Sequence, residues 1–210
     1  MPIRTTTIGA YPKPAYVPIP DWFQEKSTVA KDPTIALDNC NDCHGPQAEK
    51  LLDRATCDVV LEQVRLGIDI PGDGEVRREN YIYYHCRNLE GIDFTCLTRK
   101  AMRDGQWKVA VPTITGPIKA RNGFLVRDWR VAQAVTEKPV KITLPGPLTI
   151  IDSTYNSFYE DERKLAADLA TALNNEVRKL AEACCRWIQI DEPIFSREID
   201  KALAFGIENL

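Results

Sequence analysis

Short apolar runs alternate along the chain with longer stretches that have helical periodicity. Each apolar run ends in Gly or Pro together with a polar residue, which is typical of strands that lead into loops carrying a functional site. The predicted strands are residues 5–8, 68–70, 109–114, 140–144 and 187–190. This alternation predicts an α/β fold with a parallel sheet.

Two long segments place apolar residues on one face of a helix. Residues 48–66 carry Leu52, Ala55, Val59 and Leu66 on such a face, and Gly67 follows as a stop signal. Residues 162–183 repeat the design with Leu165, Leu169, Leu173, Val177 and Leu180. Residues 199–210 predict a last helix. No linker-like segment interrupts residues 1–210, so we expect a single domain.

The number of predicted βα units sets a limit on the fold. Five units are visible, whereas a closed (β/α)8 barrel has eight and about 250 residues. An open fragment of such a barrel would expose strand edges to solvent. We therefore expect an incomplete (β/α)8 TIM barrel that a partner chain completes.

Composition and charge exclude several classes of partner. Of the 210 residues 44% are hydrophobic and 27% are charged, as in ordinary globular domains. The 27 basic and 30 acidic residues leave a net charge of −3, which offers no basic surface for nucleic acid. No apolar stretch approaches the ~20 residues of a membrane span, and the first residues lack the apolar core of a signal peptide. We expect a cytoplasmic protein without nucleic-acid or membrane partners.

The seven cysteines include a C-x-x-C-H string formed by Cys40, Cys43 and His44. An odd number of cysteines in a reducing compartment favours free thiols or metal ligands over disulfides. The string has three interpretations: a c-type haem attachment site, a structural zinc site that also uses Cys57, or a surface loop with reduced thiols. We expect the surface loop.

Six motifs carry a resemblance to a known family. In chain order they are TTTIGAYPKP (residues 5–14), IPDWF (19–23), GEVRREN (74–80), ITGPIK (114–119), LPGPLTI (144–150) and IQIDEP (188–193). Together they resemble the catalytic domain of cobalamin-independent methionine synthase. That resemblance implies a zinc-dependent (β/α)8 barrel that transfers a methyl group to the thiol of homocysteine.

The resemblance also implies a set of substrate-binding residues. They are Ile8, Gly9 and Ala10 in the first loop, Glu75 in the GE motif and Asp191 in the IDEP motif. The chemistry agrees, because carboxylates bind an α-ammonium group and a glycine-rich turn can offer backbone N–H groups to an α-carboxylate. Family members often have Ser where this chain has Ala10, so a hydroxyl contact is absent there. The structural alternatives are a solvated loop acid for Glu75 and a helix N-cap for Asp191.

Three further residues are secondary candidates. Arg77 and Asn80 in the GEVRREN motif either position substrate or take part in structural contacts such as ion pairs. Trp129 either stacks on a planar group or belongs to an amphipathic helix that faces the sheet.

The zinc ligands of the family are a His-x-Cys motif after the strand that follows IDEP, then a Glu and a further Cys. None of these positions occurs in this sequence, so we expect a partner chain to bind the zinc. The methyl donor stays open between methylfolate and a methylcorrinoid. The family's folate-stacking Trp is missing, because Ile151, Asp152 and Ser153 occupy its place.

These features predict a subunit of a methyltransferase (EC 2.1.1 type) that provides the substrate-binding half of the enzyme. Glu75 and Asp191 favour an amino acid thiol such as homocysteine over an acidic thiol. Two alternatives stay open. One is another thiol alkyltransferase of the same superfamily that uses an epoxide or other donor, and the other is a non-catalytic binding or regulatory module.

Overall fold

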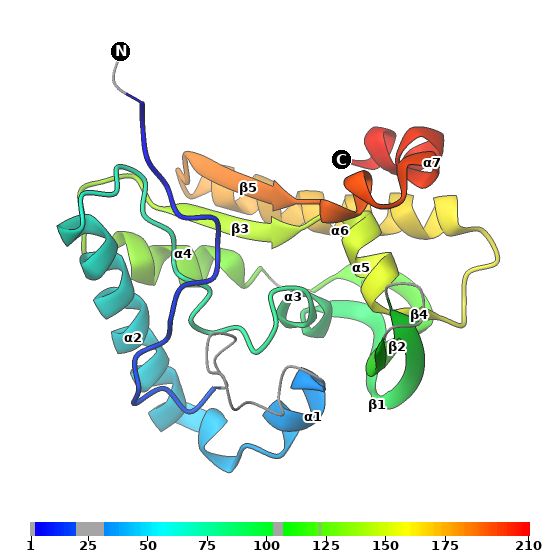
Figure 1. The fold of residues 1–210 in the computed structure, drawn as a ribbon, viewed down its shortest axis with the longest axis horizontal. Helices are drawn as coiled ribbons and strands as arrows, with labels where there is room; N and C mark the ends of the chain where they lie inside the picture. The colour runs from blue at the N-terminus through cyan, green and yellow to red at the C-terminus, as the bar shows by residue number, and fades with distance from the viewer. Residues whose placement is uncertain (1–2, 20–31, 103–106, 122) are drawn as a thin grey trace. The chain divides into compact units, whose positions relative to one another are not determined.

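The computed structural model describes residues 3–19, 32–102, 107–121 and 123–210 (Figure 1). The IPDWF motif lies outside the described residues from Pro20 onward. The elements are α1 (Pro33–Asp38), η2 (Asn41–Cys43), α2 (Gly45–Arg65), α3 (Tyr83–Arg87), β1 (Leu89–Met102), β2 (Trp107–Ala120), α4 (Leu125–Gln133), β3 (Lys141–Pro145), α5 (Pro147–Ser153), β4 (Tyr155–Asn156), α6 (Glu162–Glu182), β5 (Trp187–Asp191), η3 (Pro193–Ser196), α7 (Ile199–Lys201), η4 (Ala202–Gly206) and η5 (Ile207–Asn209).

The chain forms two compact units whose segments interleave in the sequence. The first unit consists of Met1–Tyr81, Phe124–Thr143 and Lys179–Gln189. The second consists of Ile82–Gly123, Leu144–Arg178 and Ile190–Leu210. The single domain over residues 1–210 stays a prediction.

Helix α2 is the longest helix that lies wholly in the first unit, and it confirms the helix predicted over residues 48–66. It begins with Pro46 in its first turn, where the missing N–H is not needed, and Gly67 ends it with φ +87°. The buried face includes Leu52, Ala55 and Val59. Leu66 differs from the prediction, because it follows the last helical residue and its side chain is exposed.

The predicted parallel strands form only in part. Residues 140–144 and 187–190 correspond to β3 and β5, which are neighbours in one sheet and lie side by side in Figure 1. Residues 5–8 and 68–70 are not regular strands. They contribute isolated parallel bridges instead, Thr6 with Ile70 and, just beyond, Gly72 with Lys141. These bridges are parallel, as the predicted α/β fold requires, although the two segments are too short to count as strands.

The strand predicted over residues 109–114 forms, but most of its pairing is not parallel. It lies in β2, which pairs antiparallel with β1 in a long hairpin and parallel with the short β4 only at Thr113 and Ile114. The hairpin is irregular, with register shifts between Glu90 and Ile92 and between Asp93 and Leu97. Gly91 has φ +87°, and a Cβ there would lie 2.6 Å from the Pro117 carbonyl oxygen, so only glycine fits.

Helix α6 confirms the prediction over residues 162–183, with Leu165, Leu169 and Leu180 fully buried. The last predicted helix, residues 199–210, is helical but not one regular α-helix, because α7 continues into a π-helical turn (η4) and a 3-10 turn (η5). Among the described residues, no helix has the length and apolar character needed to cross a membrane.

Candidate functional site

The first loop of the chain lies against the loop that carries Glu75. A Cβ on Gly9 would be only 2.6 Å from Glu75 Oε1, so the glycine leaves room for the carboxylate. The backbone N–H of Tyr11 donates to the Gly74 carbonyl at 3.0 Å and fixes one loop on the other. The structure therefore places two of the predicted substrate-binding residues, Gly9 and Glu75, in direct proximity.

The backbone at Glu75 has an unusual conformation. Gly74 has φ +67° and Glu75 has φ +53°, which is uncommon for a residue with a side chain. A non-glycine residue in this region costs on the order of 1–3 kcal/mol, and such strain persists where surrounding contacts fix it. One of these contacts is the Glu75 backbone N–H, which donates to Asp73 Oδ1 at 3.2 Å. The strained backbone of Glu75 and the hydrogen bond to Asp73 together fix the direction in which the Glu75 side chain leaves the loop.

Two buried polar side chains, Thr143 and Arg78, hold the Glu75 carboxylate. The Thr143 hydroxyl donates to Glu75 Oε1 at 2.7 Å and accepts a hydrogen bond from the Arg78 guanidinium at 2.9 Å. Arg78 also forms ion pairs with Glu75 at 3.5 Å and with Asp73 at 3.3 Å. Among Asp73, Glu75 and Arg78, two carboxylates face one guanidinium. This cluster is net negative when ionised, which suits a cationic group such as an α-ammonium.

Two side chains fix the carbonyl groups of the first loop. The Lys141 ammonium donates to the carbonyls of Thr7 and Ile8, and the Gln189 amide donates to the Ile8 carbonyl at 2.8 Å. In a trans peptide the following N–H points opposite to the carbonyl. The Gly9 N–H is therefore directed away from Lys141 and Gln189. This arrangement is consistent with the backbone N–H contact that the sequence predicts for this loop.

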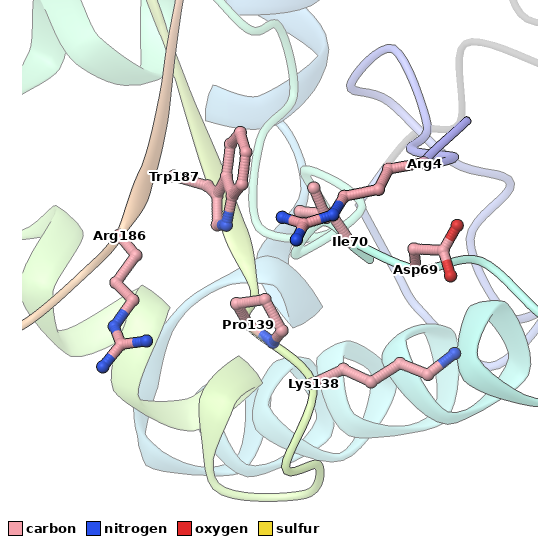
Figure 2. Close-up of a pocket in the computed structure, with 7 residues that line it drawn as sticks. All are labelled: Arg4, Asp69, Ile70, Lys138, Pro139, Arg186 and Trp187. Carbon is pink, nitrogen blue, oxygen red and sulfur yellow. The ribbon is translucent and has the colours of Figure 1, made fainter. Parts of the chain in front are cut away.

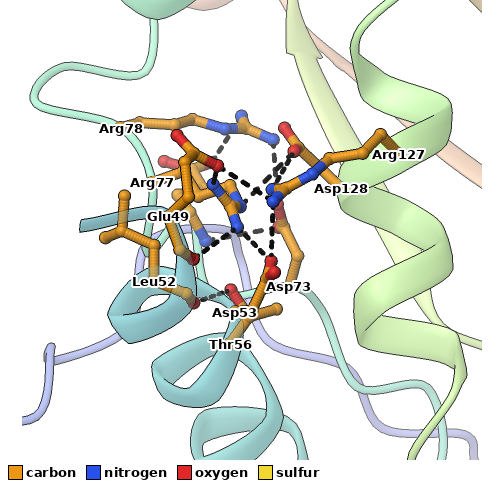
Figure 3. A network of polar contacts seen from close by, with 10 residues as sticks. Glu49, Leu52, Asp53, Thr56, Asp73, Arg77, Arg78, Arg127 and Asp128 are labelled. Atoms are coloured by element: carbon orange, nitrogen blue, oxygen red, sulfur yellow. Dashed lines mark hydrogen bonds and ion pairs between the residues drawn. The ribbon is translucent and has the colours of Figure 1, made fainter. Parts of the chain in front are cut away.

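Figure 3 shows the ion-pair network that surrounds Arg77. Its guanidinium contacts the carboxylates of Glu49, Asp53 and Asp128, and its side chain is 7% exposed. Burial by itself lowers the pKa of Arg77, but the three carboxylates outweigh it and raise that pKa. Arg77 thus joins α2 to α4, which favours the ion-pair interpretation over substrate contact.

Trp129 and Asn80 are the other two secondary candidates. Trp129 on α4 is buried, and its indole N–H donates to the Val140 carbonyl at 3.2 Å. This favours the amphipathic-helix interpretation. Asn80 is half-buried at the end of the same loop as Arg77, whereas Ile8 and Ala10 are exposed.

In the second unit, Asp191 ends β5 and its backbone carbonyl accepts from the Gly146 N–H at 2.8 Å. The next residue, Glu192, accepts from the Leu148 N–H at 2.9 Å and from the Thr149 hydroxyl, so it caps α5. Burial raises the pKa of Glu192. The residue before η3 is Glu192, so the N-cap interpretation of Asp191 is not supported.

The first unit also contains a cavity of about 560 Å³ that neither Gly9 nor Glu75 lines. Several of its residues, Arg4, Pro139 and Arg186, come just before strands or strand-like segments, whereas Gly9 and Glu75 follow them. Figure 2 shows the Arg4 guanidinium directed toward Ile70, while Lys138 and Arg186 extend elsewhere. Gly9 and Glu75 are not among the residues that line this cavity, so it is separate from the candidate site.

Comparison with known proteins decides the family. Residues 3–203 match the family model for the cobalamin-independent synthase catalytic domain, which covers nearly the whole chain. The chain belongs to this family. The methionine synthases of Sulfolobus acidocaldarius and Saccharolobus solfataricus are 32% and 31% identical to it over 200 and 211 residues. These alignments cover 94% and 98% of this chain but 54% and 57% of the relatives.

Solved structures agree with the family assignment. The B12-independent methionine synthase from Shewanella sp. W3-18-1, in complex with selenomethionine, matches with a TM-score of 0.83 and 31% identity. The match covers 98% of this chain and 56% of that chain. A vitamin-B12-independent methionine synthase from Listeria monocytogenes shares the fold, with a TM-score of 0.57 and 24% identity over 71% of this chain and 43% of that one. The α/β fold is thus confirmed, and the chain spans about half the length of the relatives it matches.

The zinc of the cobalamin-independent synthase family does not fit this chain's described residues. Among them, no group of three or more His, Cys, Asp and Glu side chains could hold a metal ion. The expectation of reduced thiols in the C-x-x-C-H string is wrong, because Cys40 and Cys43 form a disulfide. The remaining cysteines are free thiols, as expected: Cys57, Cys86, Cys96, Cys184 and Cys185.

The sequence motifs did not single out several residues that hold the first loop and the Glu75 carboxylate. Thr143 and Lys141 lie inside an apolar strand, and Arg78 lies between the two secondary candidates of the GEVRREN motif. Gln189 lies within the IQIDEP motif, and Glu192 is its second acid. The usable signal was a lysine and a glutamine within short apolar strands, since a charged or amide group there needs a partner.

Proposed function

We propose that this chain binds the amino acid substrate of a methyltransferase of the methionine synthase type, with the thiol of homocysteine as methyl acceptor. The observation that carries the proposal is the Glu75 carboxylate, held against Gly9 by Thr143 and Arg78 in a member of the cobalamin-independent synthase family. A fixed carboxylate beside a glycine loop is suited to the zwitterionic end of an amino acid.

Each group has a definite part in this proposal. Glu75 binds the α-ammonium group, and Arg78 and Thr143 orient its carboxylate. The loop of Ile8, Gly9 and Ala10 offers backbone N–H groups to the α-carboxylate. This chain therefore binds and orients the substrate. Asp191 stays a proposed substrate-binding residue on the strength of the family resemblance alone.

We further propose that a second polypeptide supplies the rest of the barrel and the zinc. The residues that support this are the substrate-binding motifs of the family, which lie in this chain, whereas the described residues include no group of three or more side chains that could hold a metal. A small thiol is the substrate, and the methyl donor is methylfolate or a methylcorrinoid.

Calorimetric titration with homocysteine tests the substrate site. We expect Glu75→Gln to weaken binding about tenfold or more, because a hydrogen bond to a charged group contributes about 1.5–3 kcal/mol. The exposed Glu182→Gln should bind as the wild type does. An analogue of homocysteine without its amino group should bind equally to the wild type and to Glu75→Gln.

Two results would refute the amino acid assignment. One is equal homocysteine affinity in the wild type and Glu75→Gln. The other is tighter binding of a sulfonate thiol than of homocysteine, which would favour the alternative thiol alkyltransferase. If the isolated chain binds neither thiol, the same variants are compared in the complex recovered from the native source.

A further inference from the structure

The C-x-x-C-H string has no part in the proposed function, and its two cysteines, Cys40 and Cys43, form a disulfide. The two residues are three positions apart with Cα atoms 5.4 Å apart. Cys40 directly precedes the 3-10 turn η2, Cys43 is the last residue of that turn, and α2 begins at Gly45, two residues after Cys43. The pair therefore lies immediately before the N-terminus of a helix of 21 residues.

The surroundings of the two sulfurs differ. Cys43 is buried in an apolar cluster with Leu37, Leu52 and Val76, whereas Cys40 is partly exposed and packs on the edge of that cluster. A thiolate from solution can therefore reach Cys40 Sγ more easily than Cys43 Sγ. The helix N-terminus stabilises negative charge, so Cys43 can leave as a thiolate.

We propose that Cys40 and Cys43 form a reversible thiol–disulfide exchange site that reacts with dithiol or glutathione-type reductants. The reductant thiolate attacks Cys40 Sγ, the bond between the two sulfurs breaks, and Cys43 departs as a thiolate that takes up a proton. A second reductant thiolate then attacks the sulfur bound to Cys40 and releases the Cys40 thiolate, which is also protonated. Two electrons pass from the reductant to the protein, and the reductant becomes a disulfide.

The apolar cluster connects this exchange to the loop of Glu75. Val76, which follows Glu75, belongs to the same cluster as Cys43, and Tyr11 packs against it. The Tyr11 N–H donates to the Gly74 carbonyl. Reduction releases the constraint on Cys43 and therefore loosens the packing under both loops. The oxidation state of the pair thus sets how firmly these loops are held.

Equilibration of the folded full-length chain with mixtures of reduced and oxidised glutathione tests the exchange. After acid quenching and alkylation, mass spectrometry of the peptide that contains both cysteines gives the ratio of disulfide to dithiol. We expect one two-electron transition across the series, with a change in this ratio of more than about tenfold. A disulfide that reduces only when the chain unfolds, or a dithiol that never oxidises, would overturn the proposal.

Single substitutions test which sulfur is attacked. In Cys43→Ser the remaining Cys40 should be alkylated at least about tenfold faster than the remaining Cys43 in Cys40→Ser, because thiol reactivity follows exposure. The exposed Cys96 serves as the internal reference for reagent activity. A faster Cys43 would contradict the assigned order of attack. Circular dichroism checks that both variants fold, and the glutathione titration of the wild type needs neither variant.

Two further measurements complete the test. Hydrogen exchange at the Tyr11 amide should be faster in the reduced chain, and equal rates would refute the link to the Glu75 loop. Stoichiometric zinc binding by the reduced pair, measured by metal analysis, would overturn the exchange site in favour of a metal site. Neither result depends on homocysteine binding, so the redox proposal and the substrate proposal can fail separately.

Discussion

Two carboxylates in this chain owe their positions to glycines. Glu75 lies against Gly9 in the first unit, and Glu192 lies against Gly146 in the second, where a Cβ would overlap the carboxylate. In each case the acid also accepts a hydrogen bond from a neighbouring threonine. A single added methyl group is therefore enough to displace a charged group, which gives predictions at the scale of one residue.

The first prediction concerns Gly9→Ala. The new Cβ would lie 2.6 Å from Glu75 Oε1, so the carboxylate must move away from Thr143. We expect homocysteine binding to weaken about tenfold or more, in line with the loss of a charge-assisted hydrogen bond. The matched control is Gly116→Ala, whose Cβ would lie 3.8 Å from its nearest neighbour. Calorimetry on both variants is the measurement, and equal affinities would refute the role of Gly9.

A second prediction follows from the raised pKa of Glu192. Burial keeps this pKa above its ordinary value of 4.5, so the folded state holds the proton at a pH where the unfolded state has lost it. The free energy of unfolding must then decrease as pH rises from 4.5 through the raised pKa. We expect Glu192→Gln to remove this decrease in urea unfolding at a series of pH values. The exposed Glu182→Gln should follow the wild-type profile, and an unchanged Glu192→Gln profile would contradict the prediction.

The sequence indicates the site residues unevenly. Gly9 and Glu75 could be predicted because their motifs resemble those of the family, and the structure brings them together. Thr143 could not, because a threonine in a short apolar strand has no distinctive spacing. Lys141 offered a signal, since an ammonium group in such a strand needs partners. The disulfide was also beyond reach, since the same C-x-x-C-H string suits thiols, a metal or a cross-link.

At the scale of elements, Arg77 connects two helices of the first unit. It pairs with Glu49 and Asp53 on α2, and Arg127 on α4 pairs with the same two acids. Arg77 also pairs with Asp128 on α4, whose side chain is only 4% exposed. Removal of a buried cation leaves such a carboxylate short of positive charge, which is more costly than the loss of a surface ion pair.

The third prediction tests this connection. Arg77→Met should lower the free energy of unfolding by about 3–5 kcal/mol, measured by urea denaturation. The double variant Arg77→Met/Asp128→Asn should recover part of the loss, because the buried charge is removed with its partner. Lys164→Met, which breaks an exposed pair with Asp168 in α6, should cost less than about 1 kcal/mol. Equal losses in Arg77→Met and Lys164→Met would show that the network is a surface feature.

The elements themselves could be predicted where periodicity was long or strands were wholly buried. Helices α2 and α6 each span 21 residues with a regular apolar face, and β3 is buried throughout. The β1–β2 hairpin could not be predicted in this way. The apolar run in β2 matches a parallel strand equally well, and the register shifts of β1 disrupt its alternation.

At the scale of the whole molecule, the coverage of the structural alignment shows how much of the related fold this chain contains. The alignment with the Shewanella structure covers 98% of this chain and 56% of the other, so about half of that fold has a counterpart here. Strand β5 pairs only with β3 among the described residues. An unpaired strand edge favours the addition of another strand. Under the function proposed above, a second polypeptide would pair with this strand edge.

The last prediction separates this assembly from a self-sufficient chain. Native mass spectrometry of the protein recovered from its source should show a complex heavier than the 23.7 kDa chain, with about one zinc ion per complex, as a single catalytic zinc site requires. The chain expressed alone should hold sub-stoichiometric zinc, because its described residues offer no group of ligands. Adding the partner to the isolated chain should restore both the zinc and methyl transfer to homocysteine. A monomer of this chain that carries one zinc and transfers the methyl group unaided would refute the second polypeptide, while leaving the Glu75 site open to its own test.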